Sequence, residues 1–243
     1  MPASNRSGLS RYLTRLLHRS NLNDEEQRAV LGLSSVTHQV RPNHDIVTPG
    51  DAVEHSCLIA HGLAARYDPM SDGQRQINLI YIPGDMSDLH SVVWPTAQWG
   101  IVALATTTVL HVPHRELRQL ADRYPALALA FWRDCTVDAS ILAKWTGCLG
   151  RRKARSRFAH LLCEMAVRME DVGLGTRESF VFEMTQSQLG DALGLTAVHV
   201  NRILQAFRAE HVIQTQRPIV SVLDWDRLVH IAEFDPGYLL RRA

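Results

Sequence analysis

Long apolar segments are missing from this sequence of 243 residues. No apolar run approaches the roughly 20 residues that a helix needs to span a bilayer. The N-terminal stretch MPASNRSGLSRYLTRLL also lacks the apolar core and cleavage site of a secretory signal peptide. We therefore expect a cytoplasmic protein that has no membrane partner.

Cysteines are few and widely separated. The four of them, Cys57, Cys135, Cys148 and Cys163, form no Cys-x-x-Cys pair. This spacing indicates neither a zinc site nor an iron–sulfur cluster, and most of the four are expected to be small buried residues or ordinary thiols. We therefore predict no metal site and no cofactor.

An excess of either charge is missing too. The sequence has 26 Lys and Arg against 25 Asp and Glu, a net charge of +1 that by itself does not indicate nucleic-acid binding. One local run does stand out, because residues 151–157 hold five cations and no acid. Such a run is typical of a solvated helix start or of a phosphate contact, and both interpretations stay open.

Common catalytic motifs are absent. The Gly-x-Ser-x-Gly elbow, the P-loop and the dinucleotide fingerprint do not occur. Twelve histidines raise an alternative hypothesis, a metal-dependent enzyme similar to the cupins with an accessory nucleic-acid-binding domain. Cupin sites resemble a His-x-His pair, which is never formed by His38, His44, His55, His61, His90, His111 or His114. We expect most of these at the surface or hydrogen-bonded, and we favour a protein that is not an enzyme.

The most informative stretch is TQSQLGDALGLTAVHVNRILQAF, residues 185–207. Thr185 and Gln188 have the spacing of a capping box, which predicts the start of a short helix. Gly194 then stands where a left-handed residue ends a helix. Thr196 follows as the cap of a second helix. The stretch therefore predicts two helices joined by a tight turn.

The second helix has two distinct faces. Its apolar residues recur at intervals of three and four and predict a buried face made of Val200, Ile203, Leu204 and Phe207. The opposite side near its N-terminus carries Ala197, Val198, Asn201 and Arg202. An ordinary helical hairpin is the alternative, but Gly190 favours close approach, and the short turn and polar outward positions favour a helix-turn-helix that reads the DNA major groove.

The segment Met184–Ile213 resembles the winged helix-turn-helix of the Crp/Fnr family of bacterial transcription regulators. The two strand-like runs around Gln216-Arg217-Pro218 predict the wing. Further upstream, residues 36–112 consist of brief β-rich runs separated by turns such as Pro49-Gly50-Asp51, which predicts an all-β barrel or jelly roll. Its place before a helix and a helix-turn-helix makes it similar to the family's cyclic-nucleotide-binding barrel.

The expected fold class is therefore α+β: an N-terminal antiparallel β-barrel or jelly roll, a long dimerisation helix and a C-terminal winged helix-turn-helix. We expect the barrel sensor in residues 1–123, the dimerisation helix in 124–149 and the DNA-binding domain in 150–243.

The long helix carries an apolar stripe of Leu127, Ala130, Phe131, Val137, Ile141, Trp145 and Leu149. The stripe could pack on its own barrel, but the resemblance implies that it joins two copies, with Asp134 and Asp138 beside the seam. We expect a helix break at Gly147 and Gly150.

The resemblance also raises the question of an effector. Cyclic-nucleotide-binding members hold the cyclic phosphate with a Gly-Glu pair and a later Arg. This chain has Gly84-Asp85 at the first place but no cation in residues 97–100 at the second, so a phosphate would be poorly compensated. We predict that cyclic AMP is not bound. Haem or iron–sulfur sensing lacks its residues as well, and the effector site stays unknown.

The resemblance implies how DNA is contacted. Ala197, Val198, Asn201 and Arg202 occupy the base-reading positions, and Arg202 matches guanine. Phosphate contacts are expected from Gln186, Thr196, His199 and Arg217. Many members have Glu where Val198 stands, so the target should differ from the common family site. The expected partners are double-stranded DNA, a second copy of the chain, RNA polymerase and a small-molecule effector.

Overall fold

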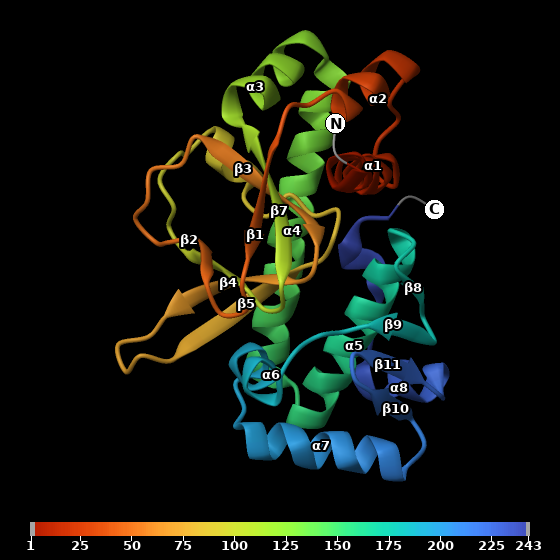
Figure 1. Cartoon of the computed structure of the whole chain (residues 1–243). Helices are drawn as coiled ribbons and strands as arrows, with labels where there is room; N and C mark the ends of the chain where they lie inside the picture. The colour runs from red at the N-terminus through yellow and green to blue at the C-terminus, as the bar shows by residue number, and fades with distance from the viewer. Residues whose placement is uncertain (1–2, 242–243) are drawn as a thin grey trace.

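The computed structural model describes residues 3–241. Two helices come first, α1 (Ala3–Leu17) and α2 (Asp24–Leu31), and both pack beside the β-domain (Figure 1). α2 begins with a capping box, in which the Asn23 side chain accepts the Glu26 N–H and the Glu26 carboxylate accepts the Asn23 N–H.

The β-domain consists of two antiparallel sheets, ordered β1-β7-β3 and β2-β6-β4-β5. Its strands are β1 (Val36–Val40), β2 (Asp45–Val47), β3 (His55–His61), β4 (Ala64–Pro69), β5 (Arg75–Tyr81), β6 (Gly100–Ala103) and β7 (Thr107–Pro113), with a 3-10 turn, η1 (Leu89–Val92). The expected all-β domain is confirmed. The chain crosses from one sheet to the other between β6 and β7.

Helices α3 (His114–Arg123) and α4 (Pro125–Arg151) follow the last strand, and α4 runs along most of the length of the molecule (Figure 1). The helix is continuous through Gly147 and Gly150 and breaks at Arg152, which has an extended backbone. The expected break at the two glycines is thus displaced. No helix in residues 3–241 combines the length and the apolar character needed to cross a membrane.

The apolar stripe of α4 is buried within its own chain. Leu127, Ala130 and Phe131 pack with α1, whereas Val137, Ile141 and Trp145 join the core shared by the barrel and the C-terminal domain. The expectation that this stripe forms the seam between two copies is therefore wrong. A helix between two domains has several neighbours to cover its apolar face, and the sequence pattern does not say which neighbour does so.

A buried ion network ties α1, the barrel and α5 together. The Arg15 guanidinium lies 2.5 Å from an Asp85 oxygen and 2.6 Å from an Asp134 oxygen. Arg168 lies 2.6 Å from the other Asp85 oxygen and 3.1 Å from Glu164. Asp134, expected beside a seam, is buried because it neutralises a buried arginine, and removing either partner would leave an uncompensated charge.

The C-terminal domain places a four-stranded sheet, ordered β10-β11-β9-β8, beside helices α5 to α8. Its elements are α5 (Ala154–Asp171), β8 (Gly175–Thr176), β9 (Ser179–Val181), α6 (Gln186–Leu193), α7 (Ala197–Ala209), β10 (Ile213–Gln216), β11 (Ile219–Val222), α8 (Trp225–Ala232) and the 3-10 helix η2 (Pro236–Leu239). The expected helix pair and wing are confirmed, whereas β8 was not anticipated.

Candidate nucleic-acid interface

The start and end of α6 follow from three side-chain and backbone features. Gln188 N–H donates to Thr185 Oγ1 at 3.1 Å, and Thr185 N–H donates to Gln188 Oε1 at 2.8 Å. This is the expected capping box. Gly194 ends the helix in the left-handed region, with φ of 61°, which an L side chain rarely adopts. The His199 N–H then donates to Thr196 Oγ1 at 3.2 Å and begins α7.

Gly190 sets how tightly the turn folds back on α6. A Cβ atom at this position would lie 2.5 Å from the carbonyl oxygen of Leu195. The Leu195 N–H also donates to the Gly190 carbonyl oxygen at 3.0 Å. Glycine is therefore needed here because the turn between the helices packs directly against its Cα. Any larger side chain would push α7 away from α6.

The outward face of α7 is the one expected from the sequence. Its apolar residues Val200, Ile203, Leu204 and Phe207 are buried, whereas Thr196, Ala197, Val198, His199 and Arg202 are exposed and Asn201 is half-buried. The Arg202 guanidinium makes no ion pair or hydrogen bond within the described part of the chain. Because α7 lies across the end of the molecule opposite α3, this face is open to a large partner (Figure 1).

Two of the candidate phosphate contacts, Arg217 of the wing and Gln186 of α6, lie close together. Arg217, in the turn between β10 and β11, donates to the Met184 carbonyl oxygen at 3.3 Å, immediately before α6. Arg217 and Gln186 line one hollow between α6 and the wing. The same hollow holds Arg208, whose guanidinium donates to Thr215. The sequence analysis did not single out Arg208, although it is a second exposed arginine of α7.

The cation run of residues 151–157 has a mixed role. The Arg155 guanidinium forms two hydrogen bonds with the Glu210 carboxylate, at 2.5 and 2.6 Å, and Arg152 donates to carbonyl oxygens at the end of α8. These two arginines hold the C-terminal domain together. Arg151 and Lys153 are exposed. Neither interpretation of the run, a solvated helix start or a phosphate contact, fits all five cations, because Arg152 and Arg155 bond within the domain and Arg151 and Lys153 face solvent.

The place where family members hold a cyclic nucleotide differs in two ways from what the sequence predicted. Asp85, which follows Gly84, is buried and committed to Arg15 and Arg168. A cation does lie near residues 97–100, because the Arg66 guanidinium of β4 stands 4.3 Å from the centre of a Trp99 ring. Sequence neighbours alone could not show this arginine.

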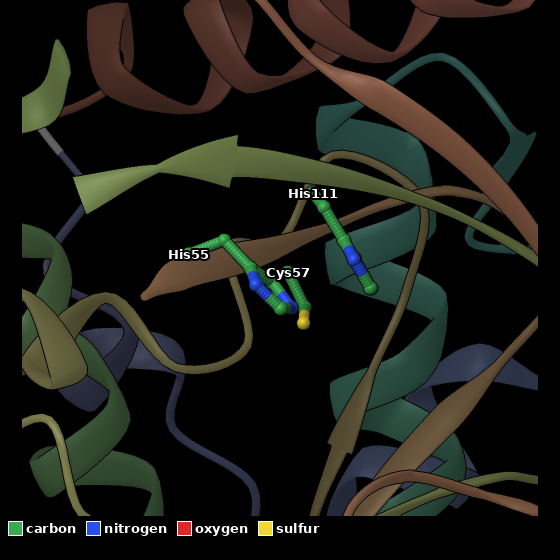
Figure 2. A group of neighbouring side chains, drawn as sticks. All are labelled: His55, Cys57 and His111. Atoms are coloured by element: carbon green, nitrogen blue, oxygen red, sulfur yellow. The ribbon is translucent and has the colours of Figure 1, made fainter. Parts of the chain in front are cut away.

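A cluster of potential metal ligands lies on the other sheet of the barrel. His55 and Cys57 of β3 and His111 of β7 place one ligand atom each within 4.8 Å of one another (Figure 2). Burial and the neighbouring His55 and His38 rings lower the pKa of His111 to about 3. Burial and the Asp88 carboxylate raise the pKa of the Cys57 thiol.

Sequence reasoning missed this cluster because it looked for His-x-His and Cys-x-x-Cys pairs. Alternate residues of a strand share a face, so His55-x-Cys57 was a readable signal. His111 could not be placed, because the pairing of β3 with β7 brings it opposite Cys57 from a distant part of the chain.

Comparison with known proteins agrees with both halves of the structure. Residues 37–124 match the cyclic nucleotide-binding domain, and residues 156–231 match the Crp-like helix-turn-helix domain. The chain is 22% identical over 193 residues to the fumarate and nitrate reduction regulatory protein of Vibrio cholerae, covering 79% of this chain and 77% of that protein. It is 24% identical over 218 residues to the transcriptional activator protein FnrL of Cereibacter sphaeroides, covering 87% and 86%.

A solved structure shares the fold. The structure of FixK2 from Bradyrhizobium japonicum aligns with a TM-score of 0.71 at 23% identity, covering 82% of this chain and 98% of that one. A barrel, a long central helix and a winged helix-turn-helix with its second helix facing outward define a DNA-binding transcription regulator. The chain belongs to the Crp/Fnr family of these regulators. The enzyme alternative finds no support in the relatives, which are regulators.

Proposed function

We propose that two copies of the chain bind a pseudo-palindromic operator, each placing α7 in the major groove of one half-site. The observation that carries this proposal is the unpaired Arg202 on the exposed face of α7. In a helix-turn-helix the N-terminal part of the second helix meets base edges, and a twofold dimer reads half-sites about one helical turn apart.

Four residues of this face are the proposed base readers. The Arg202 guanidinium can donate to O6 and N7 of guanine, and the Asn201 amide can pair with adenine in the same bidentate manner. Ala197 and Val198 offer only apolar contact, which suits a thymine methyl group. Val198 is 63% exposed, so this contact is available without rearrangement.

Four further residues are the proposed phosphate contacts. Gln186 is the first residue of α6, where free backbone N–H groups favour an anion. Thr196 and His199 lie at the start of α7. Arg217 of the wing lines the same hollow as Gln186, so these two could meet one stretch of the DNA backbone.

A dimer needs a surface at which the two copies meet, and the exposed face of α4, opposite its buried stripe, is such a surface. The exposed residues of this face are Leu129, Trp132, Thr136, Ala139, Ala143, Thr146 and Gly150, spaced alternately by three and four. This is the heptad spacing of a coiled-coil seam. Leu129 and Trp132 are 47% and 70% exposed, and the smaller residues beyond them allow two helices to approach closely. We assign this face, which we call the α4 seam, to the dimer.

The remaining partners follow from the proposed dimer on DNA. The relative FnrL is described as a transcriptional activator, which supports a contact between the DNA-bound protein and RNA polymerase. The barrel is the expected site of an effector. An effector would change DNA affinity only if it binds two arrangements of the protein unequally.

Selection from random duplexes by the full chain tests the proposal. We expect an enriched pseudo-palindrome, bound by a dimer in light scattering and preferred over a shuffled duplex in fluorescence anisotropy. A monomer that binds both duplexes equally at physiological salt would overturn the proposal.

A further inference from the structure

The candidate metal ligands stand on the inner face of the sheet β1-β7-β3. Cys57 of β3 lies directly opposite His111 of β7, and His55 follows two residues away on the same face. Ile59 and Val109 continue this face into the barrel core, whereas the alternate residues of both strands pack toward α1. Figure 2 shows the three ligand side chains projecting to the same side of their strands.

The rings of His55 and His111 contact each other and the His38 ring. The ring nitrogens of His55 and His111 form no hydrogen bond or ion pair within residues 3–241. The rings stack on each other with centroids 3.8 Å apart, and His38 lies against His111 at 4.1 Å. Polar groups without a protein partner are left to water or to a bound ligand. Together with the buried Cys57 thiol, they place three ligand atoms within 4.8 Å of one another.

We propose that His55, Cys57 and His111 bind one late first-row transition metal ion, with Zn²⁺ as the expected occupant, and that this ion is the effector of the regulator. One thiolate and two imidazoles suit Zn²⁺. Bonds of about 2.0 Å to nitrogen and 2.3 Å to sulfur require ligand atoms roughly 3.3–3.5 Å apart in a tetrahedral site. The three ligand atoms lie within 4.8 Å of one another, so binding has to draw them closer together.

Binding replaces the Cys57 thiol proton by the metal ion: the S–H bond breaks, a sulfur–metal bond forms, and the proton leaves to solvent. Three protein ligands leave the fourth tetrahedral position to water. Sites with such an open position differ from closed structural sites, which have four protein ligands. Two half-buried histidines give the ion a route from solvent, which an exchangeable effector requires.

The backbone of Cys57 connects the site to the C-terminal domain. Its carbonyl oxygen accepts the Ser87 N–H at 2.9 Å and the Ser87 hydroxyl at 3.0 Å. Its N–H donates to Asp88 Oδ1 at 2.5 Å. Residues 84–88 also hold Asp85, which pairs with Arg168 of α5. Drawing the three ligands together therefore acts on the loop that anchors α5.

Cobalt titration tests metal binding without any DNA. We expect Co²⁺ added to the chelator-treated full chain to give a near-ultraviolet sulfur-to-metal charge-transfer band that saturates at one ion per chain and is displaced by Zn²⁺. Cys57→Ser should abolish the band, whereas the matched control Cys135→Ser should retain it. A missing band, or one that follows Cys135 instead of Cys57, would overturn the metal site.

Because substitution of the buried Cys57 could unfold the protein, two further variants test the site without changing this residue. His111→Gln should weaken Co²⁺ binding at least about tenfold while its circular dichroism matches the parent. His38→Ala should retain parental affinity, because His38 is outside the ligand set. Equal weakening by both variants would contradict the assigned ligands.

The effector role rests on the DNA binding proposed above, whereas metal binding does not. We expect Zn²⁺ to change the operator affinity of the parent at least about fivefold and to leave the His111→Gln variant unchanged. Equal parental affinity with and without Zn²⁺ would overturn the effector role. If neither protein binds any duplex, the proposed function fails and the Co²⁺ result still decides the metal site.

Discussion

Helices α4 and α7 each bury one face in their own chain and expose the other, but the two exposed faces differ in chemistry. The α4 seam presents Leu129 and Trp132, large apolar side chains left open to solvent. The outward face of α7 presents small and polar residues with Arg202. Exposed apolar surface favours a protein partner, whereas a cation on a polar face favours a phosphate or a base edge. This difference supports the proposal that α4 pairs two copies and that α7 reads DNA.

The largest effect should come from breaking the α4 seam. Trp132→Glu replaces the most exposed large apolar side chain of the proposed seam by a charge, so we expect a monomer in light scattering. Loss of the second half-site contact should weaken operator binding by about 10²–10⁴-fold, the range in which linked binding sites reinforce each other. Anisotropy titration with the selected operator measures this loss.

Trp94→Glu is the matched control, because Trp94 is a similarly exposed tryptophan on the barrel, 62% open to solvent. This variant should remain a dimer with parental affinity. If Trp94→Glu dissociates the protein and Trp132→Glu does not, the seam is assigned to the wrong surface.

The next effect concerns the junction between the end of α4 and the C-terminal domain, where His160 of α5 lies close to Arg152. His160 is buried there, and burial together with Arg152 and Lys144 lowers its pKa from 6.5 to about 4. The folded protein holds the neutral ring, so protonation favours unfolding. This contribution is intact above pH 6.5 and is lost as the pH falls toward 4, by up to about 3 kcal/mol.

Urea unfolding at pH 7.5 and 4.5 measures this dependence. His160→Gln cannot be protonated and should show a shallower fall in unfolding free energy between the two pH values. Parallel falls in the parent and the variant would show that other groups carry the acid sensitivity.

The helix-turn-helix could be predicted well because its signals are local. The cap at Thr185, the left-handed Gly194 and the cap at Thr196 lie within a few residues of the elements that they delimit. Periodicity then assigned both faces of α7 correctly, since a reader helix in a small domain has one core to face.

The same periodicity found the buried residues of α4 but not what covers them. Asp134 interrupts the apolar stripe because it pairs with Arg15, 119 residues away along the chain. The ligand cluster shows the same limit, because strand alternation joins His55 to Cys57 but only the pairing of β3 with β7 adds His111. Features that depend on contacts between distant segments require the fold itself.

A smaller effect should come from the reading face itself. Arg202→Ala removes the proposed guanine contact, so binding to the operator should weaken by about 1–3 kcal/mol while binding to a shuffled duplex changes little. Arg123→Ala is the matched control, because it removes an exposed arginine from α3, at the opposite end of the molecule. Equal losses on both duplexes for Arg202→Ala would remove Arg202 from the base readers.

The smallest effect should come from the wing, where Arg217 is proposed to meet phosphate. Arg217→Ala should weaken binding to the operator and to the shuffled duplex by the same factor, because a phosphate contact carries no sequence information. Each lost contact reduces the slope of log affinity against log salt by about 0.9, so a dimer with two wings should lose about 2. Titrations at several salt concentrations measure this slope. A loss confined to the operator would make Arg217 a base reader, and the division between α7 and the wing would have to be redrawn.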